Sequence, residues 1–172
     1  ANWVILPLLG VRVFPANLAG LDATAAGVLG MSLLMGSRGI GSLAGPLIGG
    51  LLAGPSPGRM RQGILYGFLL AAAGYLALAG TPNLPLACLA VALAHAGGAT
   101  VWVFSTTLLQ GQTEDRFRGR VFSAESALHM LGTSAASYAA GLAVDLGAAV
   151  RAVALATGAA MLIPLAAGAL LQ

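Results

Sequence analysis

The chain has 172 residues with 8 basic and 5 acidic side chains; 58% of its residues are hydrophobic, only 8% are charged, and the mean hydropathy is +0.90. Because soluble domains contain about 25% charged residues, this composition excludes an ordinary soluble domain and indicates a membrane protein. The basic residues are all arginines spread between apolar segments, with no stacking aromatics on a shared basic face, so nucleic-acid binding is not expected.

The apolar segments predict an all-α membrane protein with six transmembrane helices, because a span needs about 20 apolar residues and Pro/Gly-rich or charged turns separate the segments. The expected spans are residues 1–16, 24–53, 63–80, 86–110, 119–146 and 152–171. The first span is short, and the chain begins at Ala1 without a signal sequence. We therefore expect a truncated first helix and a fragment of a longer protein.

Arginines in the short loops predict the orientation of the chain in an inner or plasma membrane. Cytoplasmic loops of membrane proteins carry an excess of basic residues. The other loops carry at most Arg12 and Arg151, whereas those after the second and fourth spans carry Arg59, Arg61, Arg116, Arg118 and Arg120. These two loops and the C-terminus are therefore expected on the cytoplasmic side.

An internal repeat is visible in the small residues of the second and fifth spans. The offset from Ser37 to Thr133 is 96 positions, and the same offset relates two stripes of small residues at every fourth position. Such stripes let membrane helices approach closely. The residues expected to pack helices in this way are Gly41, Gly45, Gly49, Ser137 and Gly141. The match is either chance in a Gly/Ala-rich chain or the sign of two inverted three-helix repeats, as in secondary transporters.

Ionisable residues inside spans are costly and are candidates for function. Arg38 lies in the second span and His95 in the fourth, whereas the third and sixth spans have no charge and are expected to face lipid. Arg38 is either a fixed cation for an anionic substrate group or half of a structural pair with a carboxylate or carbonyls. His95 is either a packing histidine or a substrate contact, and Trp102 is a candidate for the same path.

Glu125 and His129 lie four residues apart in the fifth span and therefore share a helix face. A carboxylate and an imidazole in this arrangement are candidates for proton coupling, because both can exchange protons across a physiological gradient. The alternative is that Glu125 pairs with an arginine of the preceding loop.

Metal and cofactor chemistry is not expected. Cys88 is the only cysteine, and Glu125 and His129 lack a third ligand and an HExxH pattern. Gly132–Ser134 resembles the serine turn of an intramembrane protease only weakly, because no Gly-x-Ser-Gly is present. We therefore expect no enzyme, no cofactor and no metal site.

The charged stretch from Gln110 to Ser123 (QGQTEDRFRGRVFS) resembles the loop between helices ten and eleven of the major facilitator superfamily. It is most similar to the exporter branch that includes siderophore and macrolide efflux proteins, although Glu114 replaces the usual proline. Residues 38–46 (RGIGSLAGP) also look like helix eight of that branch. The matching loop positions are Asp115, Arg116, Arg118, Gly119, Arg120 and Val121.

The resemblance implies that residues 1–172 are helices seven to twelve, the C-terminal half of a twelve-helix transporter. It implies efflux of a small molecule by alternating access, usually as a proton antiporter, with the charged loop as a cytoplasmic gate. The expected partners are the lipid bilayer, the missing N-terminal half and a small-molecule substrate, and the fragment alone is expected to be inactive. The alternatives are a non-transporting six-span structural or sensory protein, or an intramembrane protease.

Overall fold

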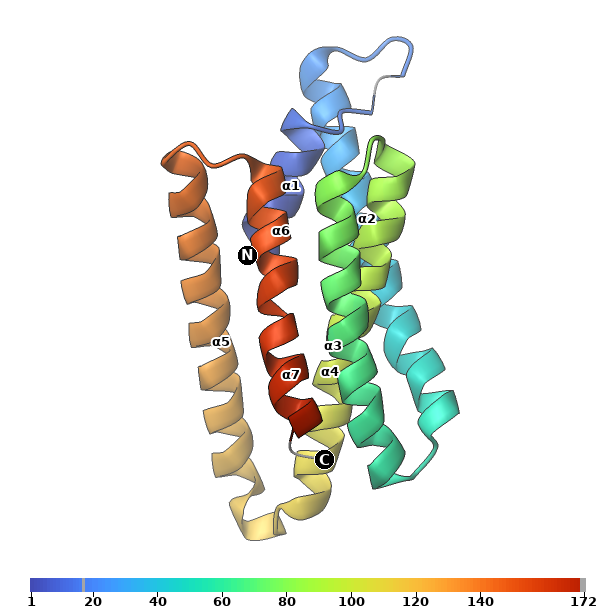
Figure 1. Ribbon diagram of the computed structural model, residues 1–172, viewed down its shortest axis with the longest axis vertical. Helices are drawn as coiled ribbons and strands as arrows, with labels where there is room; N and C mark the ends of the chain where they lie inside the picture. Colours follow the sequence, from blue (N-terminus) through green and yellow to red (C-terminus); the bar gives the residue numbers. More distant parts are fainter. Residues whose placement is uncertain (17, 171–172) are drawn as a thin grey trace.

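The computed structural model describes residues 1–16 and 18–170, and within these residues all regular structure is helical. The all-α class predicted from the sequence is therefore confirmed. Figure 1 shows long helices running up and down an elongated bundle. The helices are α1 (Asn2–Arg12), α2 (Ala23–Ala53), α3 (Pro57–Gly80), α4 (Leu84–Gln112), α5 (Asp115–Asp145), α6 (Val150–Ala160) and α7 (Leu162–Leu170).

Three helical stretches in the described part of the chain are long and apolar enough to cross a membrane: α3, α4 and the run Val150–Gly168 formed by α6 and α7. Helix α1 is apolar but shorter. Helices α2 and α5 are each 31 residues long; α2 has Arg38 near its middle, and charged residues fill the start of α5.

Capping residues define where the long helices begin. The side chains of Asp22, Ser56 and Asn83 accept hydrogen bonds from backbone N–H groups in the first turns of α2, α3 and α4. Proline also occupies the first turn of α3 and α4, where its missing N–H leaves no bond unmade. The turns that the sequence marks by Pro, Gly and Asn are therefore helix starts with satisfied donors.

The division between α6 and α7 follows from Pro164. A proline inside a helix cannot donate to the carbonyl four residues earlier and its ring crowds that carbonyl. For Pro164 that carbonyl belongs to Ala160, the last residue of α6. Helices α6 and α7 therefore form one apolar run with a local break at Met161.

Helix α4 is the centre of the bundle, with α2 and α3 packed along it. Gly41 and Gly45 of α2 face the backbone of Ala92 and Ala96, so closely that an added Cβ would collide with the two carbonyl oxygens. At Gly49, an added Cβ would lie 3.3 Å from the Thr100 methyl group. The stripe expected to pack helices thus fits against a matching row on α4.

A second close crossing joins α3 to α4. An added Cβ at Gly97 of α4 would collide with the Gly67 carbonyl oxygen of α3, and one at Gly74 would lie 2.5 Å from the backbone nitrogen of Ala94. Helix α3 also contacts α6, and Arg151 donates from Nη1 to the Ala79 carbonyl, 3.0 Å away, at the C-terminal end of α3. Helices α2, α3, α4 and α6 form the tightly packed part of the molecule.

Among the long helices, α5 is packed the most loosely, and its only buried residue is Ala140. Figure 1 shows α5 at the edge of the bundle, beside α6. At Gly141, an added Cβ would meet nothing within 4 Å in the described structure, and Ser137 lies beside the start of α1. The stripe on α5 therefore has the spacing of the stripe on α2 without an equally close partner.

The charged stretch is largely helical instead of forming a loop. Helix α5 begins at Asp115, four residues before the expected start at 119, because Asp115 favourably occupies the positive N-terminal turn of the helix. The carboxylate of Asp115 also pairs with Arg118 at 2.7 Å, one helical turn away. The α2–α3 connection, the α4–α5 connection and the end of α7 lie at the same end of the bundle (Figure 1).

Candidate functional site

An open cavity of about 870 Å³ separates α5 from α3, α4 and α6. Half of the residues that line it are alanines, including Ala136 and Ala140 of α5 and Ala152 and Ala156 of α6. Small side chains on facing helices leave space between them, and the few polar groups that enter this space set its chemistry. The polar side chains that line the cavity are Asn2, Tyr75, His95, His129, Thr133 and Thr157.

Tyr75 and His95 form a polar pair in the cavity wall. The Tyr75 Oη lies 3.3 Å from the His95 Nε2, and the two rings meet edge to face with centroids 6.1 Å apart. The tautomer of the imidazole decides which group donates this hydrogen bond. His95 therefore has a packing partner and also faces the cavity, and its role as a substrate contact stays a prediction.

Arg38 lies half-buried on α2, with its guanidinium 4.4 Å from the centroid of the Trp3 ring. Its Nε is buried and has no hydrogen-bond partner within the described residues. It forms no ion pair there either, since the ion pairs found are Arg116–Glu114 and Arg118–Asp115. The structural alternative of an Arg38–carboxylate pair therefore finds no support in this part of the chain.

Arg38 does not line the cavity itself; it lies within electrostatic range of Tyr75 and His95 but bonds to neither in the described structure. Three helices thus contribute to one cluster: Arg38 from α2, Tyr75 from α3 and His95 from α4. A fixed guanidinium with an unpaired donor, within electrostatic range of an imidazole and a phenol, is suited to attracting a group rich in hydrogen-bond acceptors, such as a carboxylate.

Two side-chain pairs join α5 to α4 beside the cavity. The rings of Trp102 and His129 lie with centroids 4.4 Å apart and tilted by 55°. Thr106, one turn further along α4, donates from Oγ1 to the Glu125 Oε1 at 3.1 Å, one turn earlier along α5. The candidates Trp102, Glu125 and His129 therefore meet at one antiparallel contact, and Glu125 bonds to a threonine where an arginine of the charged stretch was the alternative.

We expect Thr106→Val to lower the free energy of unfolding by about 1 kcal/mol, because it leaves the half-buried Glu125 without its hydrogen-bond donor. Thr107→Val is the matched control, since the Thr107 hydroxyl donates within its own helix to the Val103 carbonyl. Thermal unfolding of the purified protein in detergent measures both variants. Equal effects of the two substitutions would contradict a stabilising contact between α4 and α5.

The charged residues expected at the gate lie away from the cavity, in the first turns of α5. Asp115, Arg116 and Arg120 are exposed, and both side chains of the Arg116–Glu114 pair, which are 2.8 Å apart, are largely exposed to solvent. At Gly119, an added Cβ would meet nothing within 4 Å, so no close packing in the described structure requires a glycine. The Arg118 Nε is buried without a hydrogen-bond partner among the described residues.

Two residues do not stand out in the sequence: Tyr75, a member of the cluster, and Trp3, which contacts the cluster through Arg38. Tyr75 belongs to the segment 63–80, which has no charged residue and was expected to be scaffold facing lipid, yet Tyr75 is buried and lines the cavity. Trp3 lies near the start of the chain and supplies the ring for Arg38. The sequence signal that could have identified Tyr75 is its hydroxyl group in a span without charged residues, because a buried hydroxyl needs a hydrogen-bond partner.

Among the described residues, no group of three or more His, Cys, Asp and Glu side chains is arranged to hold a metal ion. Comparison with known protein families, with curated proteins and with solved structures finds no match. The functional interpretation therefore rests on the geometry of this chain and on the resemblance of its charged stretch to exporters.

Proposed function

We propose that this chain forms six membrane-spanning helices, as the C-terminal half of a major facilitator transporter, and that the complete protein exports a small molecule with an anionic group. The observation that carries the proposal is Arg38 on α2, which has no ion pair among the described residues and lies within electrostatic range of the Tyr75–His95 pair in the cavity wall. A charge inside an apolar helix raises the free energy of the protein, and a bound substrate anion would offset that cost. The three helices able to cross a membrane support the location.

Alternating access requires one part of the bundle to move against another, and α5 is the element best suited to move. It has a single buried residue and contacts α4 mainly through side chains, whereas α2, α3 and α4 interlock through glycines. Elements with few buried contacts open at low free-energy cost. The arginines at the start of α5 act in this proposal as the cytoplasmic gate, in addition to anchoring the topology.

Proton antiport is assigned to Glu125 and His129, which sit on the mobile helix at its contact with α4. We expect Glu125→Gln in the complete protein to abolish the response of efflux to an imposed pH gradient, because the amide cannot take up a proton. Glu114→Gln is the control, since Glu114 is an exposed acid beside the same helix. Substrate flux in proteoliposomes, with and without a pH gradient, is the measurement.

The same flux measurement on vesicles that contain the complete protein distinguishes a transporter from a non-transporting membrane protein. Substrate accumulation driven by a pH gradient supports a proton-coupled exporter. Absence of flux under every imposed gradient, with correctly inserted protein, would instead favour a non-transporting membrane subunit. Gradient-driven flux that Glu125→Gln leaves unchanged would keep the transporter and remove Glu125 from the coupling step.

A further inference from the structure

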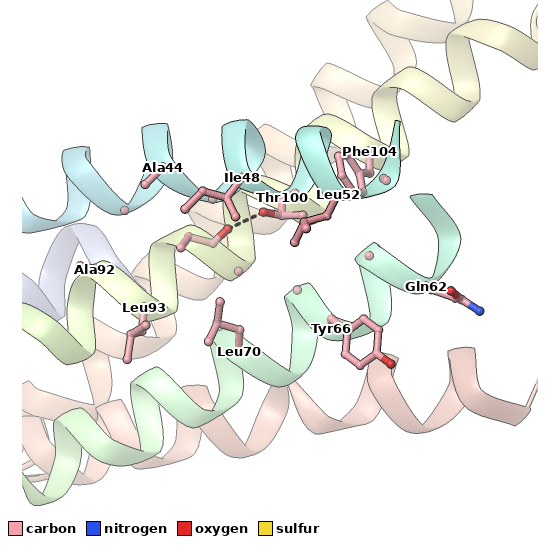
Figure 2. Close-up of a pocket in the computed structure, with 18 of the residues that line it drawn as sticks. Ala44, Ile48, Leu52, Gln62, Tyr66, Leu70, Ala92, Leu93, Thr100 and Phe104 are labelled. Atoms are coloured by element: carbon pink, nitrogen blue, oxygen red, sulfur yellow. Dashed lines mark hydrogen bonds between the residues drawn. The ribbon is translucent and has the colours of Figure 1, made fainter. Parts of the chain in front are cut away.

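A second hollow lies on the opposite side of α4 from α5. It is a groove of about 570 Å³, walled by the second half of α2 and the first half of α3 and floored by α4. Figure 2 shows Ala44, Ile48 and Leu52 on one wall, and Tyr66 and Leu70 on the other. Of these, Leu52 is 73% exposed and Tyr66 is 70% exposed, so the groove is an accessible apolar surface.

The groove exists because α2 and α3 both pack on α4 and hardly touch each other. The glycine stripe brings α2 down onto α4, and Gly67 brings α3 down beside it. Small residues then form the floor, while larger side chains stand along the two rims. The floor is polar only at Thr100, whose hydroxyl is already bonded to the Ala96 carbonyl at 2.8 Å, so an occupant meets an apolar surface (Figure 2).

Positive charge collects at one end of the groove, where the short α2–α3 connection lies. Arg59 and Gln62 line this end, and Arg61 follows in the same turns of α3. The N-terminus of α3 adds about half a positive charge, and its first turn contains no acidic residue. Neither arginine belongs to an ion pair among the described residues. An anion at this end would therefore be favoured.

We propose that the groove binds an anionic phospholipid, with an acyl chain between α2 and α3 and its phosphate at Arg59 and the N-terminus of α3. The apolar part runs along α2 from Ile40 to Ala53, about 20 Å at the rise of an α-helix. This length is enough to hold an acyl chain across one leaflet, whose hydrocarbon half is about 15 Å thick. The combination of an apolar groove and an unpaired basic end distinguishes anionic from neutral lipids. Lipid binding in this groove does not require the protein to be a transporter.

The test uses the complete protein, purified and depleted of lipid, and titrated with phosphatidylglycerol or with phosphatidylcholine of the same acyl chains. Native mass spectrometry reports bound lipid and oligomeric state together. We expect phosphatidylglycerol to bind at least about tenfold more tightly, since each basic residue contributes about 1 kcal/mol. Combined Arg59→Gln and Arg61→Gln substitution should bring the two affinities to within about threefold, whereas Arg116→Gln, a charge loss at the same end of the bundle, should preserve the preference.

A second pair of variants tests the acyl-chain part. Ala44→Phe places a ring in the groove and should weaken binding of both lipids by about tenfold or more, whereas Leu43→Phe changes an exposed neighbour that does not line the groove and should have no effect. Equal affinity of the unsubstituted protein for the two lipids would overturn the proposal. A dimer that Ala44→Phe dissociates would also overturn it, and would make a second copy of the chain the occupant.

Discussion

Gly45→Ala is expected to lower the free energy of unfolding by about 3 kcal/mol, even though a single methyl group is added. The new Cβ would collide with the Ala96 carbonyl oxygen, which belongs to the backbone of α4 and cannot rotate away. Overpacking of a tight contact costs about 1–3 kcal/mol, and a backbone neighbour places this site at the upper end. The unfolding midpoint of the purified protein, followed by circular dichroism, measures the change.

Gly39→Ala is the matched control on the same helix. At Gly39, an added Cβ meets nothing within 4 Å in the described structure. Because alanine favours helix over glycine by up to about 1 kcal/mol, this variant should unfold at the same or a higher temperature. If Gly45→Ala and Gly39→Ala lower the free energy of unfolding equally, the glycine stripe on α2 does not stabilise the contact between α2 and α4.

The sequence predicts that crossing only in part. Spacing at every fourth residue places Gly41, Gly45 and Gly49 on one face, which is enough to predict a close helix neighbour. It does not identify α4, because the partner row contains alanines and a threonine that are ordinary in any apolar helix. The same spacing on α5 leaves Gly141 without a close neighbour in the described structure. Spacing therefore predicts a surface that permits close packing, and the partner depends on the whole bundle.

The ionisable residues of the candidate site are visible in the sequence because each is expensive in an apolar helix. Arg38 and His95 stand out for this reason, and they lie in one cluster. Their arrangement depends on how the helices are rotated about their axes, which the sequence does not specify. The sequence does not single out Tyr75, because a tyrosine ring is compatible with an apolar helix and only its hydroxyl group is polar.

Arg38→Ala is expected to reduce export of an anionic substrate by the complete protein about 10–100-fold, mainly by raising KM. A hydrogen bond to a charged group contributes about 1.5–3 kcal/mol, and the Nε of Arg38 has no hydrogen-bond partner in the described structure. Removing the guanidinium leaves His95 and Tyr75 as the remaining hydrogen-bonding partners for the anion. Initial rates of substrate uptake into inverted vesicles, at several substrate concentrations, separate KM from the maximal rate.

Two controls determine whether the effect comes from the charge at this position. Arg38→Lys keeps the charge but loses the planar guanidinium over Trp3, so its export should fall less than that of Arg38→Ala. Arg12→Ala removes an exposed arginine from the last turn of α1 and should leave KM unchanged. An Arg38→Ala protein that is correctly inserted and exports at the unsubstituted rate would exclude Arg38 from substrate binding. Lysine restores the positive charge without the guanidinium geometry. Export by Arg38→Lys that lies between that of Arg38→Ala and that of the unsubstituted protein would therefore show how much of the effect comes from the charge and how much from the orientation of the anion.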